Sequence, residues 1–131
     1  MIEGIGIDMI EVERVSEKMA RTEGFRELVF SQNEIDYCEK KKNKFEHYAA
    51  RFAAKEAFYK AIGAGWMNGT AFNEIEITND DKGKPLITFL GNTLALMNEM
   101  GILNIHVSLT HLKTMASAVV IIENQRKQIV L

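Results

Sequence analysis

The sequence contains little of what marks several common protein classes. Cys38 is the only cysteine among 131 residues, so no intrachain disulfide is expected and a reducing, cytoplasmic location fits. No apolar run reaches the roughly 20 residues of a membrane span, and the N-terminus has no basic segment followed by an apolar core, so we expect neither membrane insertion nor a signal peptide. The net charge of −2 argues against a general nucleic-acid binder.

Several cofactor motifs are also absent. The chain has no His/Cys cluster with zinc spacing and no Walker or dinucleotide glycine pattern, which disfavours zinc, ATP and NAD sites. The apolar fraction is 47%, which is enough for one core in a single domain over residues 1–131.

The most strongly patterned stretch is residues 45–63, FEHYAARFAAKEAFYKAIG. Its apolar side chains recur every three or four residues, which predicts a long helix with an apolar stripe. Glu56 falls inside that stripe, where a buried carboxylate is costly unless a positive group meets it. Lys60 lies one turn further on. The two residues are either an ordinary surface pair, or Glu56 is a carboxylate at the edge of the core that binds a cation.

Residues 2–8 alternate as expected for a strand. Gly4, Gly6 and Asp8 share one face, and the two glycines leave room for something to approach the strand backbone closely. Asp8 ends that face. Taken alone it is more typical of an N-cap for the following helix, and its alternative role is a metal ligand at the strand end.

The rest of the chain alternates helix and strand signals. Ser31 and Glu34 form a capping box, which predicts a helix from there to about Lys40. Other helices are expected over about 10–20, 23–30 and 92–100, and strands over 72–78, from Pro85, over 104–111 and over 115–123. This order predicts an α+β fold, with helices packed on a small antiparallel sheet.

Two features outside the long helix are polar or charged. In residues 104–111, His106, Ser108 and Thr110 share one face, which either meets water or lines a site. Basic residues gather in 40–44 and at Arg14, Lys18 and Arg21. By default such clusters are solvated faces.

Four blocks of the sequence together resemble the holo-acyl-carrier-protein synthase family, the small single-domain 4′-phosphopantetheinyl transferases. They are GIGIDMIEVERV, ARFAAKEAFYKAIGAG, FNEIEITNDDKGKP and HVSLTHLKTMASAVVIIE. The blocks occur in the family order over nearly the whole chain, which is more specific than any one of them.

The resemblance implies a Mg²⁺-dependent enzyme of fatty acid biosynthesis. It would move the phosphopantetheine arm of coenzyme A onto a serine of apo acyl carrier protein and release adenosine 3′,5′-bisphosphate. The family pattern places metal ligands at Asp8 and Glu56 and a phosphate contact at Lys60. The acceptor of the serine proton stays open between Glu56, a water beside it and Asp36.

The family pattern also implies further contacts with coenzyme A, at Arg51, Lys60, Lys84, Pro85, His106 and Thr110. Two positions depart from it. Ala50 stands where the family often has glycine, and Leu112 stands where it often has a hydroxyl, which weakens the case for a coenzyme contact at 112.

The resemblance further implies a homotrimer with the coenzyme between neighbouring copies. Carrier proteins of this type are acidic, so we expect docking on Arg14, Lys18 and Arg21, which share one helix face close to Asp8. Two alternatives are a non-catalytic module that binds coenzyme A or a carrier protein, and a structural domain whose buried carboxylates are satisfied ion pairs.

Overall fold

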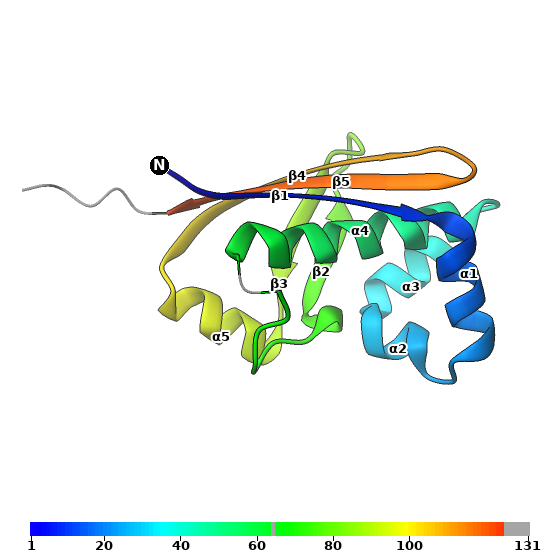
Figure 1. The fold of residues 1–131 in the computed structure, drawn as a ribbon, viewed down its shortest axis with the longest axis horizontal. Coiled ribbons are helices and arrows are strands. Elements are labelled where there is room, and N and C mark those ends of the chain that lie inside the picture. The colour runs from blue at the N-terminus through cyan, green and yellow to red at the C-terminus, as the bar shows by residue number, and fades with distance from the viewer. Residues whose placement is uncertain (64, 125–131) are drawn as a thin grey trace, which may run out of the picture.

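The computed structural model describes residues 1–63 and 65–124 (Figure 1). Helices and strands follow one another in the order β1 (Ile2–Glu11), α1 (Val12–Arg21), α2 (Phe25–Val29), α3 (Gln32–Glu39), α4 (Lys44–Ile62), the 3-10 turn η1 (Phe72–Glu74), β2 (Ile75–Asn79), β3 (Pro85–Phe89), α5 (Gly91–Glu99), β4 (Ile102–His111) and β5 (Met115–Asn124). No helix in these ranges is long and apolar enough to cross a membrane.

The strands form two antiparallel sheets. One has the order β1-β5-β4, and the other is the hairpin of β2 and β3. Figure 1 shows α4 running beneath the larger sheet, with α1, α2 and α3 gathered near one of its ends and α5 near the other. The expected α+β fold with helices on a small antiparallel sheet is confirmed.

Strand β1 lies unusually close to α4. A Cβ atom on Gly6 would overlap the carbonyl oxygen of Ala57, and one on Gly4 would overlap that of Ala61. Only glycine allows a strand backbone to approach a helix backbone in this way. The predicted close approach is therefore confirmed, and its partner is α4.

Helix α4 is buried on nearly all sides, so the single apolar stripe predicted for it was too narrow. Tyr48, Ala53 and Phe58 have no exposed surface although they point in different directions around the helix. The helix packs on the larger sheet and also against α1, α3 and β2. It ends at Gly63, whose φ of 86° is the left-handed conformation expected of a glycine after a helix.

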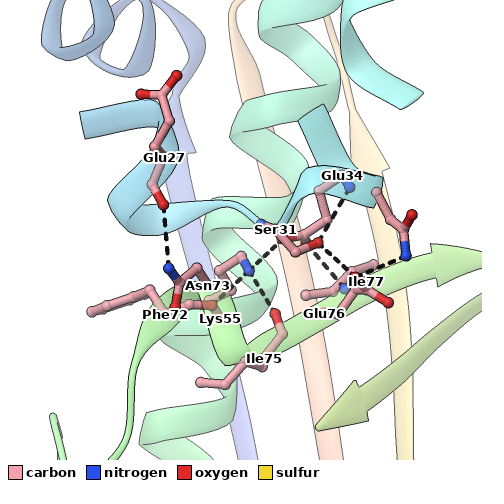
Figure 2. A network of polar contacts seen from close by, with 10 residues as sticks. Glu27, Ser31, Glu34, Lys55, Phe72, Asn73, Ile75, Glu76 and Ile77 are labelled. Atoms are coloured by element: carbon pink, nitrogen blue, oxygen red, sulfur yellow. Dashed lines mark hydrogen bonds and ion pairs between the residues drawn. The ribbon is translucent and has the colours of Figure 1, made fainter. Parts of the chain in front are cut away.

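A buried ion pair joins α4 to α3 and β2 (Figure 2). Neither Lys55 nor Glu34 has any exposed side-chain surface, and Lys55 Nζ lies 2.7 Å from Glu34 Oε1. The ammonium also donates to the carbonyl oxygens of Phe72 and Ile75. All three of its protons are therefore used inside the protein, as a buried charge requires.

Glu34 completes this network. Its carboxylate accepts hydrogen bonds from the backbone N–H of Ser31 and of Ile77, at 2.9 and 3.0 Å. The capping box of Ser31 and Glu34 is present as predicted. Nothing in the local sequence pattern distinguishes Lys55, and Glu34 is predicted from it only as a capping residue.

Two predicted boundaries were wrong. Strand β1 continues to Glu11, which is the N-cap of α1, so Asp8 lies inside the strand and does not cap the helix. The extension has a physical cause, because residues 8–11 pair with residues 115–118 of β5. The strand expected from residue 72 begins at Ile75, after the turn η1.

The larger sheet has one face packed on α4 and one face that points away from it. The outward face has side chains from all three strands, and its large apolar members on β1 are 61%, 65% and 65% exposed. These are Ile5, Ile7 and Met9. On β4 the same face has His106, Ser108 and Thr110, all exposed, as their alternation predicted.

Candidate active site

Asp8 and Lys60 meet where β1 passes α4. Lys60 Nζ lies 2.9 Å from Asp8 Oδ1 and donates to the carbonyl oxygen of Ile7 at 3.1 Å. The position of Asp8 is fixed from the other side, since Ser117 Oγ donates to its backbone carbonyl at 3.0 Å. Lys60 is therefore paired with Asp8, and a surface pair with Glu56 is not the arrangement observed.

Glu56 lies one turn before Lys60 on α4 and is half-buried. Burial raises the pKa of its carboxyl, and the nearby negative charge of Asp8 raises the pKa further, against the opposing effect of Lys60 and Lys18. Within the part of the chain that the structure describes, no hydrogen bond or ion pair reaches the Glu56 side chain. Asp8 and Glu56 therefore face the same region, and of the two only Asp8 has an ammonium as a hydrogen-bond partner.

This arrangement fits a hard divalent cation. Mg²⁺ prefers oxygen ligands, takes few from the protein and completes its octahedron with water and phosphate oxygens. Among residues 1–63 and 65–124, no group of three or more acidic, histidine or cysteine side chains is arranged to enclose a metal. Asp8 and Glu56 thus suit an ion shared with a substrate, rather than one enclosed by protein.

A second group of polar residues surrounds a pocket of about 180 Å³ on another flank of α4. Arg51 is almost fully buried there, donates to Asn79 Oδ1 at 2.7 Å and lies over the ring of Tyr37, 4.1 Å from its centre. Its Nε has no hydrogen-bond partner among the described residues. Pro85 lines the same pocket, so the structure brings Arg51 and Pro85 together.

Lys84 stands between Gly83 and Pro85, which both line this pocket, whereas the other predicted coenzyme contacts lie away from it. Lys84 is exposed in the turn before β3, where its backbone N–H donates to Asp80. His106 and Thr110 are exposed on the outward face of β4, and His106 Nε2 is 3.2 Å from Glu123 Oε2. One chain therefore does not gather all the predicted contacts into one site.

The two groups lie at opposite edges of the larger sheet. Asp8 is on β1, at one edge, and His111, which lines the Arg51 pocket, is on β4, at the other edge, with β5 between them. Asp36, the less favoured proton acceptor, is exposed on α3 and accepts a hydrogen bond from Gln32 of the same helix. Since α3 packs on α4 and β2, nothing places Asp36 beside Asp8.

Sequence reasoning missed two histidines of the Arg51 pocket. His111 Nδ1 lies 2.9 Å from Glu46 Oε1, and the rings of His47 and His111 have centres 5.0 Å apart. Burial lowers the pKa of His47, and the neighbouring His111 lowers it further. The spacing of His47 and Arg51, four residues on one helix, is the signal that could have placed them on one face.

The basic residues of α1 are exposed, as predicted for Arg14, Lys18 and Arg21. Lys18 is close enough to Glu56 to oppose the rise in its pKa, and its Nζ lies 5.6 Å from the centre of the Phe52 ring. This basic face therefore borders the region of Asp8 and Glu56.

Comparison with known proteins agrees with the resemblance drawn from the sequence. The family model described as the 4′-phosphopantetheinyl transferase superfamily matches residues 4–115. The holo-[acyl-carrier-protein] synthase of Cytophaga hutchinsonii is 47% identical over 123 residues, which cover 92% of this chain and 97% of the relative. That of Syntrophus aciditrophicus is 41% identical over 124 residues, which cover 94% and 97%.

Solved structures give the same result. The holo-[acyl-carrier-protein] synthase of Neisseria meningitidis superposes with a TM-score of 0.86 at 29% identity, covering 95% of this chain and 100% of that chain. The synthase of Bacillus anthracis, solved in complex with CoA (3′,5′-ADP), gives 0.78 at 35% identity, covering 95% and 99%. This chain therefore belongs to the 4′-phosphopantetheinyl transferase superfamily and, within it, to the holo-[acyl-carrier-protein] synthases.

Proposed function

We propose that this chain transfers the 4′-phosphopantetheine arm of coenzyme A to a serine hydroxyl of an apo acyl carrier protein. The observation that supports this most directly is the meeting of Asp8, Glu56 and Lys60 between β1 and α4. The relatives are named for the same activity, and synthases of Bacillus anthracis and Helicobacter pylori were solved with the coenzyme or its nucleotide part.

In this reaction the serine oxygen forms a bond to the phosphorus that bears the pantetheine arm. The bond from that phosphorus to the bridging oxygen breaks, and adenosine 3′,5′-bisphosphate leaves with the electron pair. Negative charge grows on the phosphate oxygens, and the Lys60 ammonium can donate hydrogen bonds to them. A Mg²⁺ ion held by Asp8 and Glu56 would add further compensation of that charge.

The serine must lose its proton during the transfer. Glu56, or a water beside it, is the preferred acceptor, because its carboxylate faces the same region as Asp8 and Lys60 and no donor among the described residues occupies it. Holo acyl carrier protein is then available for fatty acid biosynthesis, which we place in the cytoplasm.

A homotrimer is the assembly that best joins the two halves of the site. Asp8 and the Arg51 pocket lie at opposite edges of the sheet, and His106 and Thr110 are exposed on the outward face of the same edge strand, β4, that reaches the pocket. The exposed Ile5, Ile7 and Met9 give the same face an apolar surface that a neighbouring copy could cover. We therefore place coenzyme A in clefts between subunits packed through their sheets. A monomer in light scattering with full transfer activity would contradict this arrangement.

The activity is tested by mass spectrometry of a purified apo acyl carrier protein after incubation with coenzyme A, Mg²⁺ and this protein. The carrier should gain the mass of one phosphopantetheine. D8A and E56A should nearly abolish the gain while circular dichroism shows that both variants fold, since removing a costly buried carboxylate need not destabilise. A carrier that stays unmodified with the parent protein refutes the proposed function. Parent-like turnover by either variant at saturating Mg²⁺ refutes the role of that residue.

A further inference from the structure

The ammonium of Lys60 is hydrogen-bonded to the Asp8 carboxylate, which the proposed cation also needs as a ligand. Lys60 Nζ is bonded to Asp8 Oδ1 at 2.9 Å, and the side chain of Asp8 is only 17% exposed. A carboxylate with so little accessible surface offers few directions of approach. A cation that binds Asp8 together with Glu56 therefore comes close to Lys60 and is repelled by it.

The side chain of Lys60 can also move away from Asp8 into solvent. Its side chain is 54% exposed, and its two hydrogen bonds, to Asp8 and to the carbonyl oxygen of Ile7, lie on the exposed side of α4. Movement of Lys60 away from Asp8 would leave its ammonium in solvent and so would bury no charge.

We propose that Lys60 competes with the cation for Asp8 in the free protein, and that a phosphate of coenzyme A removes Lys60 from Asp8. The inference rests on the proposed function, because it requires the cation and the phosphate to meet here. Its consequence is positive coupling. Coenzyme A draws Lys60 away and so strengthens cation binding, and by thermodynamic reciprocity the cation strengthens coenzyme A binding.

The test measures Mn²⁺ binding directly, from the electron paramagnetic resonance signal of free Mn²⁺, with no carrier protein present. Without coenzyme A, K60M should bind Mn²⁺ more tightly than the parent, by roughly twofold to fivefold, the range that an exposed ion pair contributes. K60R keeps the charge and should resemble the parent. K82M removes an exposed lysine outside the site and serves as the matched control.

Addition of coenzyme A completes the experiment. It should tighten Mn²⁺ binding by a larger factor in the parent than in K60M, because only the parent has a lysine to displace. K60M with parent-like or weaker Mn²⁺ affinity overturns the competition, and so does a K60M that shows no binding in the measured range. D8A with parent-like Mn²⁺ affinity instead shows that the cation binds elsewhere, which overturns the metal site of the proposed function.

Discussion

Lys55 and Glu56 are neighbours in the chain but occupy opposite kinds of environment. Lys55 has no exposed side-chain surface and gives all its protons to Glu34, Phe72 and Ile75. Glu56 is half-buried and meets no donor among the residues described. A satisfied buried charge is structural, whereas an unsatisfied carboxylate beside a second one is available to a ligand.

His47 should make stability depend on pH. Burial, together with the neighbouring His111 and Arg51, lowers its pKa in the folded protein, so the unfolded chain takes up a proton first as the pH falls. The free energy of unfolding should therefore decrease as the pH drops below about 6.5, the ordinary histidine value, and be unaffected by His47 above it. Urea unfolding between pH 5 and 8 measures this. H47Q should make the free energy of unfolding depend less steeply on pH. An equally steep dependence in H47Q and the parent would contradict the prediction.

At the scale of elements, the distance between β1 and α4 sets the distance between Asp8 and Glu56. Gly6 lies two residues before Asp8 on the same strand face, directly over Ala57, the neighbour of Glu56. We expect G6A to lose about 1–3 kcal/mol of stability through overpacking. Its transfer rate should fall at pH and Mg²⁺ conditions where the variant is fully folded, because the carboxylates move apart.

The control for this substitution is E11A, at the exposed end of the same strand. It should keep the stability and the transfer rate of the parent. Urea unfolding and the mass-spectrometric transfer assay give the two quantities. A G6A variant that matches the parent in both would show that the close approach of strand and helix does not determine the geometry of the site.

The Lys55–Glu34 pair joins α4 to α3 and β2. Removing only the lysine should destabilise the protein more than removing both charges. K55M leaves the Glu34 carboxylate buried without its cation, so we expect a loss of about 3–5 kcal/mol in the free energy of unfolding. E34Q/K55M removes the buried charge, although the single amide oxygen of Gln can accept from only one of the backbone N–H groups of Ser31 and Ile77, which bond different oxygens of Glu34. The double variant should be more stable than K55M in urea unfolding. Equal stability of K55M and E34Q/K55M would show that the Glu34 carboxylate, buried without its cation, carries no cost.

Local patterns predicted most elements, and long-range partners account for the errors. The capping box of Ser31 and Glu34 and the glycine after α4 depend on residues a few positions apart, so they could be found in the sequence. The end of β1 depends on pairing with β5, more than 100 residues away, and for that reason Asp8 was more typical of a cap than of a strand residue. Lys60 likewise bonds Asp8, 52 residues away, and not Glu56.

In the whole molecule, the structure brings together some of the side chains that the family pattern singles out and separates others. Asp8, Glu56 and Lys60 come together, and so do Arg51 and Pro85, but the two groups lie on different flanks of α4. Hydrophobic periodicity in the sequence cannot predict that these residues fall into two separate groups, because their separation depends on which edge of the sheet each strand occupies. The pocket histidines were missed for the same reason, since His111 reaches His47 only through the placement of β4 beside α4.

The basic face of α1 should receive the acidic carrier protein. Arg14, Lys18 and Arg21 are exposed, and Lys18 borders Glu56, so a carrier held there would have its serine near the proposed metal site. Exposed ion pairs contribute only about 0.2–1 kcal/mol each, so the cluster should act mainly on the encounter rate and weaken as salt screens it. R14E/R21E should therefore raise the apparent KM for carrier protein and leave coenzyme A affinity almost unchanged.

Steady-state transfer rates at low and high ionic strength measure this effect. The parent should lose activity as salt rises, and R14E/R21E should be less sensitive because its attraction for the carrier is already gone. K41E/K42E reverses two exposed lysines between α3 and α4 and gives the matched control with the same change of charge. If the α1 variant has the carrier KM of the parent at low ionic strength, the carrier docks elsewhere. If the control raises KM equally, the net charge of the protein attracts the carrier and α1 has no special part in docking.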